Sequence, residues 1–179
     1  MTLVWYVDDV LLLGRSPEEL STQVRQVVTK LEDLGMKINY AKCILEPTQK
    51  IEYLGQVLNF VDRTITPVQE KIVGTARMTK QLRHGTRSSA QRVAALAGKI
   101  LDLAKGMPSL HSLARPLMSI AGKMAAKSGW SVYTEKPPLL KEVLATVKDI
   151  LRERTPMPMP SNKPRWTRQT RPISVGGQC

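Results

Sequence analysis

The chain has 179 residues, 42% of them hydrophobic, which suits one or two small globular domains. Its two cysteines, Cys43 and Cys179, are too far apart in sequence to form a metal-binding knuckle or a disulfide framework, so we expect reduced thiols in an intracellular protein. No apolar run is long enough to span a membrane, and the N-terminus carries no targeting signal that we recognise. Nucleus and cytoplasm are therefore both open as locations.

The charge is distributed unevenly along the chain. The net charge is +12, yet residues 1–66 carry 7 Lys/Arg and 9 Asp/Glu. Residues 67–127 carry 11 Lys/Arg and only 2 Asp/Glu, and residues 155–179 carry 4 basic and no acidic residues. A strongly basic segment favours a polyanionic partner. We expect RNA or DNA as that partner, rather than a membrane surface, although an idle basic surface would show the same pattern.

The first sixty residues predict a strand-rich segment with one helix. Two apolar runs around Asp8-Asp9 predict a β-hairpin over residues 1–14. Ser16 has the character of an N-cap, and apolar residues then recur at helical spacing, which predicts an amphipathic helix over residues 17–34. Further strands are expected at residues 36–39, 44–45 and 51–60, the last with an internal glycine.

From Pro67 onward the pattern is helical. Thr66 and Ser88 resemble N-cap residues, because each is followed three positions later by glutamine. The periodicity predicts helices at about 67–83, 89–104, 110–124 and 139–151. After Arg154 the chain is rich in proline and basic residues, so a disordered tail is expected over 155–179.

The predicted fold class is therefore α+β, in three segments. Residues 1–66 form a strand-and-helix region, residues 67–154 an all-helical basic region, and residues 155–179 the tail.

The adjacent carboxylates of Asp8 and Asp9 are the first candidate site. At the tip of a hairpin both can reach one locus, where a hard cation such as Mg²⁺ would accept carboxylate oxygens. A plain polar hairpin turn would show the same two residues, so the pair alone leaves both interpretations open.

The surrounding motifs resemble those of reverse transcriptases. Tyr6-Val7-Asp8-Asp9, between apolar runs, resembles the YxDD box of that family. Leu34-Gly35-Met36-Lys37-Ile38-Asn39, followed by Lys42-Cys43 and Pro47, resembles the next element, and Glu52 to Leu58 resembles the primer-grip strand. The basic helices after Thr66 fall where the family places its thumb. Spacing is most similar to retroelement enzymes of the LTR or tyrosine-recombinase kind.

The resemblance implies specific roles. Asp8 becomes a Mg²⁺ ligand and Asp9 its weaker partner, and both are catalytic on this interpretation. Lys42 matches a position suited to protonate departing pyrophosphate, although an exposed turn lysine is equally compatible. Primer or nucleic-acid contacts are implied for Tyr6, Leu54 and Gly55, where an ordinary bulge glycine is the alternative for Gly55. The basic region adds phosphate-binding candidates, which are Lys71, Arg77, Lys80, Arg83, Arg87 and Arg92.

The chain also departs from the family pattern. Family polymerases hold their metals with a third carboxylate and seat the nucleotide with fingers residues, and both precede the YxDD box. Only five residues precede Tyr6, so we expect the chain to be inactive in isolation. Two hypotheses follow. The chain is part of an RNA-directed DNA polymerase whose partner is the missing fingers–palm portion, or it is a non-catalytic RNA- or DNA-binding descendant within a ribonucleoprotein. A degenerate retroelement reading frame is a third possibility.

Overall fold

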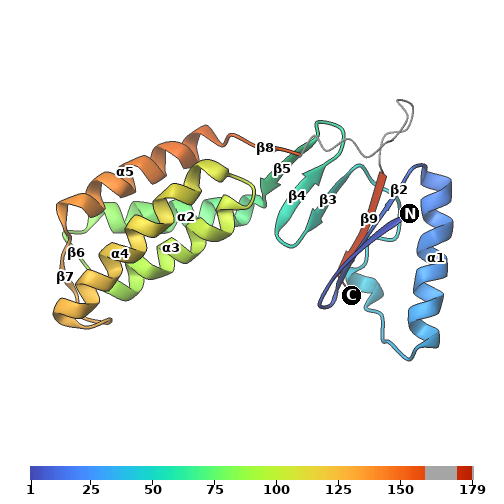
Figure 1. Ribbon diagram of the computed structural model, residues 1–179, viewed down its shortest axis with the longest axis horizontal. Coiled ribbons are helices and arrows are strands. Elements are labelled where there is room, and N and C mark those ends of the chain that lie inside the picture. Colours follow the sequence, from blue (N-terminus) through green and yellow to red (C-terminus); the bar gives the residue numbers. More distant parts are fainter. Residues whose placement is uncertain (160–172, 179) are drawn as a thin grey trace. The chain divides into compact units, whose positions relative to one another are not determined.

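The computed structural model describes residues 1–159 and the backbone of residues 173–178. It contains two compact units, residues 1–65 with 158–179 (the strand-rich unit) and residues 66–157 (the helical unit). The mixed α+β class is confirmed (Figure 1). Residues 160–172 and 179 lie outside the described part, so most of the predicted disordered tail is not described. The sequence did not indicate the strand at residues 173–178.

The first sheet of the strand-rich unit carries the predicted hairpin. Its strands are antiparallel and lie in the order β1-β2-β9, so β2 is central (Figure 1). Helix α1 packs on this sheet, and Gly14 permits the close approach because a Cβ there would lie 3.0 Å from the Cβ of Leu20. Ser16 caps the helix as predicted by accepting a hydrogen bond from the Glu19 amide. The elements are β1 (Thr2–Tyr6), β2 (Asp9–Gly14), β9 (Ile173–Gln178) and α1 (Pro17–Asp33).

The second sheet corrects the prediction of one strand over residues 51–60. The chain instead forms a tight hairpin there, because Leu54 and Gly55 have φ values of +50° and +72°, which turn the backbone back on itself. The strands predicted at 36–39 and 44–45 do not form, and a short 3₁₀ helix lies between them at Tyr40–Lys42. The sheet order is β3-β4-β5-β8. Its strands are β3 (Lys50–Tyr53), β4 (Gln56–Asn59), β5 (Thr64–Pro67) and β8 (Met157–Pro158).

The helical unit contains the four predicted helices with small shifts in their ends. Thr66 is not an N-cap, because β5 continues to Pro67 and the helix begins after Val68. Ser89 rather than Ser88 caps the next helix, accepting from the Arg92 amide at 3.4 Å. The elements are α2 (Gln69–His84), α3 (Ala90–Ala104), a 3₁₀ turn (Pro108–Leu110), α4 (His111–Ser128), α5 (Pro138–Glu153) and the short strands β6 (Arg87–Ser88) and β7 (Thr134–Glu135).

The helices share one core. Its buried side chains come from all four helices and include Leu96, Leu117 and Leu144, each fully buried. The core forms because each helix places its apolar residues along one face. None of the described helices is both long enough and apolar enough to cross a membrane.

Candidate functional site

The carboxylates predicted as metal ligands lie at the tip of the β1–β2 hairpin. Tyr6 pairs with Asp9, so Val7 and Asp8 are the two central turn residues. Asp8 is exposed and Asp9 half-buried. Val7 has a φ of +52°, the positive value that the first central residue takes in the primed hairpin turns. A β-branched residue in this region costs about 1–3 kcal/mol, and such outliers concentrate at functional sites.

Contacts on both sides fix this tip. The Trp5 indole N–H donates to the Val7 carbonyl at 2.6 Å. From the second sheet, the Tyr53 hydroxyl donates to the Asp9 carbonyl at 3.5 Å. Burial, and secondarily the negative charge of Asp9, raises the pKa of Tyr53, which further favours the protonated phenol that donates this hydrogen bond. The β3–β4 hairpin therefore braces the carboxylate-bearing strand.

Alternation along β2 divides its side chains between two small clusters. Val10 and Leu12 pack against α1. Leu11 points the other way and packs against Ile51 and Tyr53 of β3. Strand β2 is thus held by packing on both faces, which fixes the position of the Asp8-Asp9 tip at its end.

The donor set at the tip fits part of a Mg²⁺ site. Mg²⁺ in phosphate-processing sites is typically bound by one or two carboxylates, with water and substrate phosphates completing the octahedron. Asp8 and Asp9 supply two carboxylates of this kind. Within residues 1–159, no group of three or more His, Cys, Asp or Glu side chains comes together that could hold a metal. The tip can therefore supply part of a metal site.

The structure places the other predicted polymerase residues at separate points of the strand-rich unit. Tyr6 is 59% exposed beside the carboxylates, and Leu54 and Gly55 form the β3–β4 turn. Lys42 is exposed in its 3₁₀ turn, and no described ion pair joins it to Asp8 or Asp9. The structure places Tyr6 opposite Asp9, whereas among the described residues Lys42 forms no ion pair with either carboxylate.

Sequence reasoning missed Gln56, at the start of β4. This residue is 7% exposed, and neither atom of its side-chain amide has a hydrogen-bond partner in the described structure. A buried unpaired amide is costly and rare. The only sequence signal was its place directly after the Leu54-Gly55 turn.

Several basic candidates of the helical unit are engaged within the protein. Lys71 pairs with Asp102 at 2.7 Å, and Lys105 pairs with the same carboxylate at 3.2 Å. The hydrogen bond from Lys71, with further help from Lys105, lowers the pKa of Asp102. Lys71 is therefore already partly neutralised.

Two arginines contact the segment after α4. Arg87 donates to the Tyr133 carbonyl at 2.6 Å. Arg92 donates to the Tyr133 hydroxyl at 3.5 Å and to the Gln81 side chain at 3.3 Å. The tyrosine itself is 48% exposed. Arg87 is exposed and Arg92 half-buried, and these contacts hold both side chains in place.

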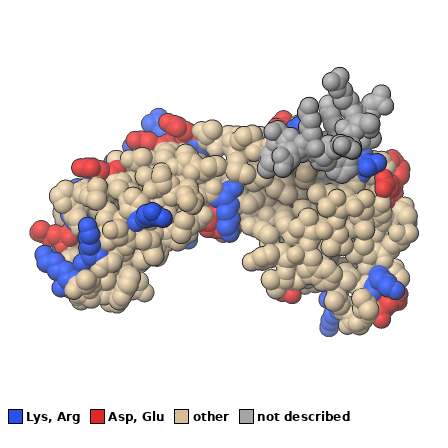
Figure 2. Space-filling view, viewed as in Figure 1, with Lys and Arg blue, Asp and Glu red and all other residues tan. Residues whose placement is uncertain are grey.

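The remaining candidates do not form one stripe. On the face shown in Figure 2, basic side chains of the helical unit appear as separate groups with acids among them. Arg77 is exposed on α2, whereas Lys80 and Arg83 line a groove between α2 and α5. Sequence reasoning did not single out the α5 side of this groove.

Comparison with known proteins finds a family match within the strand-rich unit. Residues 1–58 match the family described as reverse transcriptase (RNA-dependent DNA polymerase). The chain is 27% identical over 121 residues to the Transposon Tf2-3 polyprotein of Schizosaccharomyces pombe, which covers 68% of this chain and 8% of that protein. The Tf2-4 polyprotein of the same organism matches to the same extent, and the Tf2-7 polyprotein is 26% identical over 121 residues.

The chain thus spans 8% of the length of the curated relatives it matches. No solved structure matches it significantly. The family match includes the whole β1–β2 hairpin and α1, and the alignment to the transposon proteins is long enough to include residues outside that match. The chain is therefore similar to reverse transcriptases over residues 1–58, and to Tf2 transposon polyproteins over 121 residues.

Proposed function

We propose that this chain carries the metal-binding hairpin and a nucleic-acid-binding helical unit of an RNA-directed DNA polymerase. One observation carries the proposal. Tyr6-Val7-Asp8-Asp9 presents two adjacent carboxylates at a hairpin tip, inside the region that matches the reverse transcriptase family. On this proposal the YVDD hairpin binds the metal and the helices act as a thumb. Activity then depends on a further polymerase segment.

The chemistry expected at the tip is phosphoryl transfer. A bound Mg²⁺ would orient triphosphate oxygens and stabilise charge during in-line displacement. Asp8 and Asp9 contribute carboxylate oxygens, and Tyr6, exposed next to them, supports the terminal nucleotide of the primer. Tyr53 positions the strand through its hydrogen bond to Asp9. Lys42 is proposed as the proton donor to pyrophosphate.

The helical unit is proposed to act as a thumb that binds a template–primer duplex. Residues 66–157 carry 16 Lys/Arg and 6 Asp/Glu. Contacts to phosphates depend little on sequence, which a polymerase requires of its duplex-binding surface. Leu54 and Gly55, at the β3–β4 turn, are proposed to contact the primer, since the turn lets backbone approach a sugar-phosphate chain.

Primer extension tests the proposal. Residues 1–179 alone are expected not to extend a primer on an RNA template with Mg²⁺, because the described residues offer no third carboxylate beside Asp8 and Asp9. Addition of a separately expressed fingers–palm segment of a reverse transcriptase should restore extension. Asp8→Asn should abolish it, and Glu18→Gln on the nearby helix serves as a matched charge control. Asp8-dependent extension by the chain alone would overturn the need for a further segment.

A second function is favoured by the same missing carboxylate. The chain would then be a non-catalytic RNA- or DNA-binding component of a ribonucleoprotein. On this alternative, nucleic-acid binding persists in Asp8→Asn, and no supplied polymerase segment restores extension. Extension that depends on both Asp8 and the added segment would exclude it.

A further inference from the structure

A groove between α2 and α5 gathers basic residues from two distant parts of the sequence. It has a volume of about 490 Å³, within the roughly 300–1,000 Å³ of typical ligand pockets. The Arg154 side chain donates to Gln69 at 3.3 Å, so the end of α5 lies beside the start of α2 and the two helices are antiparallel. The residues that line the groove are Ala76, Thr79, Lys80, Arg83, His84, Lys148, Leu151, Arg152 and Arg154.

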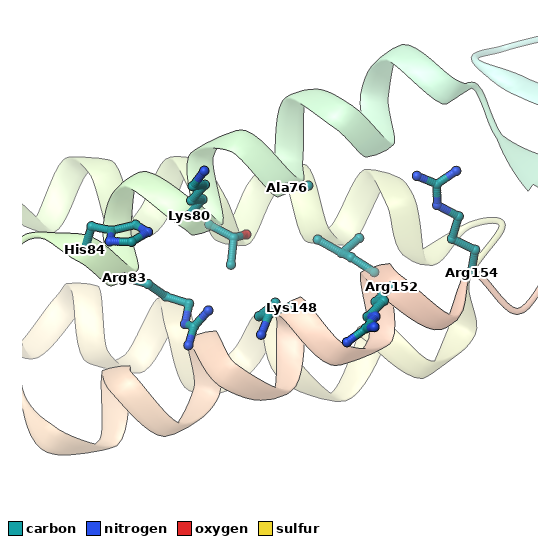
Figure 3. Close-up of a pocket in the computed structure, with 9 residues that line it drawn as sticks. Ala76, Lys80, Arg83, His84, Lys148, Arg152 and Arg154 are labelled. Carbon is teal, nitrogen blue, oxygen red and sulfur yellow. The ribbon is translucent and has the colours of Figure 1, made fainter.

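The cations approach the groove from both helices. Arg83 extends from α2 toward α5, and Lys148 and Arg152 lie on the facing side of α5 (Figure 3). Lys80 lies one turn along α2 from Arg83, and Arg154 lies at the far end of the groove (Figure 3). Together these five residues contribute five basic side chains to the lining of the groove, and no carboxylate lines it.

No ion pair among the described residues neutralises these charges. The ion pairs among the described residues join Lys71 and Lys105 to Asp102, outside the groove. Lys148 and Arg152 are four residues apart on one helix, a spacing at which like charges repel. Gathering unpaired cations around one hollow disfavours the empty state, and an anion in the groove would relieve that repulsion.

The floor of the groove narrows the choice of anion. Thr79 and Leu151 are 2% and 5% exposed, and the Thr79 hydroxyl already donates to the Thr75 carbonyl at 2.9 Å. The floor therefore offers packing rather than a free hydrogen-bond donor. Recognition comes from cations placed along the length of the groove, which suits an extended ligand with several negative groups. Arginine binds phosphate oxygens through its planar fork, and two arginines on opposite helices can engage successive phosphates.

We propose that the α2–α5 groove binds linked phosphate groups, and specifically the phosphates of a nucleic-acid strand. The choice of a nucleic acid as their source rests on the proposed function. The expected affinity for linked phosphates does not rest on the proposed function, because it follows from the basic lining of the groove. The site adds Lys148, Arg152 and Arg154 to the surface through which the helical unit holds its ligand.

Binding measured on the full chain tests the proposal. Fluorescence anisotropy with labelled single-stranded and duplex oligonucleotides is recorded over a range of salt concentrations, with inorganic tripolyphosphate as competitor. The groove variant is Arg83→Gln with Arg152→Gln. The matched control, Lys123→Gln with Lys127→Gln, removes the same charge from exposed positions of α4. Circular dichroism checks that each variant keeps its helices.

The groove variant should weaken oligonucleotide binding and flatten the log–log salt slope by about 1 to 2, since each phosphate contact contributes roughly 0.7 to 0.9. Tripolyphosphate should displace the oligonucleotide from the parent chain, and should bind the groove variant more weakly than the parent. The control should change the slope clearly less. Equal weakening by groove and control variants would overturn the proposal, because charge alone would then explain binding.

Two further results keep the test decisive. Loss of tripolyphosphate binding with unchanged oligonucleotide binding would overturn the nucleic-acid source and assign the groove to a free polyphosphate. If the double variant does not fold, tripolyphosphate titration of the parent chain, followed by nuclear magnetic resonance, must shift the amides of Ala76, Thr79 and Leu151. Unshifted amides there would overturn the site. Neither assay involves Asp8 or metal, so the result stands apart from primer extension.

Discussion

The two units differ in how their described side chains are buried. The helical unit has a single core of 21 buried residues, most of them from the four long helices. The strand-rich unit has two clusters, one of 4 and one of 3 buried residues, while Leu3, Val4 and Trp5 of β1 are 39% to 48% exposed. Buried apolar area is the main stabilising term, so the helical unit should fold stably and the strand-rich unit should be marginal. The carboxylates thus lie on the less stable unit, and most of the basic residues on the more stable one.

The largest effect should come from removing a buried leucine from each unit. Leu96→Ala should lower the free energy of unfolding of the helical unit by about 2–5 kcal/mol while leaving it folded. Leu20→Ala, at the centre of the four-residue cluster, should abolish protection of the strand-rich unit. Hydrogen exchange measured by mass spectrometry follows both units in one experiment. Protection of residues 1–59 equal to that of α3 in the parent chain would contradict the comparison.

One substitution should stabilise the strand-rich unit and so reduce the difference in stability between the two units. Gln56→Met should raise the free energy of unfolding of the strand-rich unit by about 1–3 kcal/mol, because the apolar side chain of similar size removes an unpaired buried amide. Gln26→Met, on the exposed side of α1, is the control and should stay within about 0.5 kcal/mol. Urea denaturation, followed by hydrogen exchange of residues 50–59, measures the free energy of unfolding of the strand-rich unit in both variants. A destabilised Gln56→Met variant would show that the amide has a partner in solution.

Lys136 should make the free energy of unfolding of the helical unit depend on pH. Its ammonium is buried and donates to the Leu82 carbonyl, and burial, with the positive charges of Lys141 and Arg92, lowers its pKa. The unfolded chain therefore binds more protons above the folded pKa, so stability should rise with pH up to the ordinary lysine value of 10.5. Thermal unfolding between neutral and alkaline pH should show this rise relative to Lys136→Met. Parallel pH profiles for the two proteins would refute it.

The smallest effect concerns the ion pairs of Asp102. Asp102→Asn should cost the helical unit under about 1 kcal/mol, because the carboxylate is 35% exposed and solvent screens both pairs. Its pKa is lowered from 3.8, so its contribution is present above that pH and is lost as pH falls through the lower folded value. A double-mutant cycle with Lys71→Met isolates the pair. A coupling energy well above 1 kcal/mol would show that the pair is shielded from water.

Local signals predicted much of this fold. Ser16 correctly predicted the start of α1. The apolar periodicity after Pro67 predicted four helices to within a few residues of their ends. The turn at Leu54-Gly55 was missed because leucine rarely adopts a positive φ, so the stretch resembled one continuous strand. Strand β9 was missed because its pairing with β2 joins residues more than 150 positions apart.

The candidate site was predicted only in its local parts. The Asp8-Asp9 turn follows from adjacent sequence, whereas the contact from Tyr53 depends on how β3 meets β2. The basic groove was hidden because Lys148 and Arg152 alternate with acids along α5, so the net charge of residues 128–154 is only +1. Their spacing of four residues was the available signal, and it becomes a site only where α5 packs beside α2.

Paramagnetic relaxation by Mn²⁺ tests most directly whether the strand-rich unit holds the metal. In the isotopically labelled chain, low concentrations of Mn²⁺ should broaden the amide signals of residues 7–10 before those around the acidic pair Glu18-Glu19. Asp8→Asn with Asp9→Asn should remove that selectivity, because the carboxylate oxygens are the ligands. Broadening that is equal at the two places, or unchanged in the double variant, would contradict a metal site at the hairpin tip.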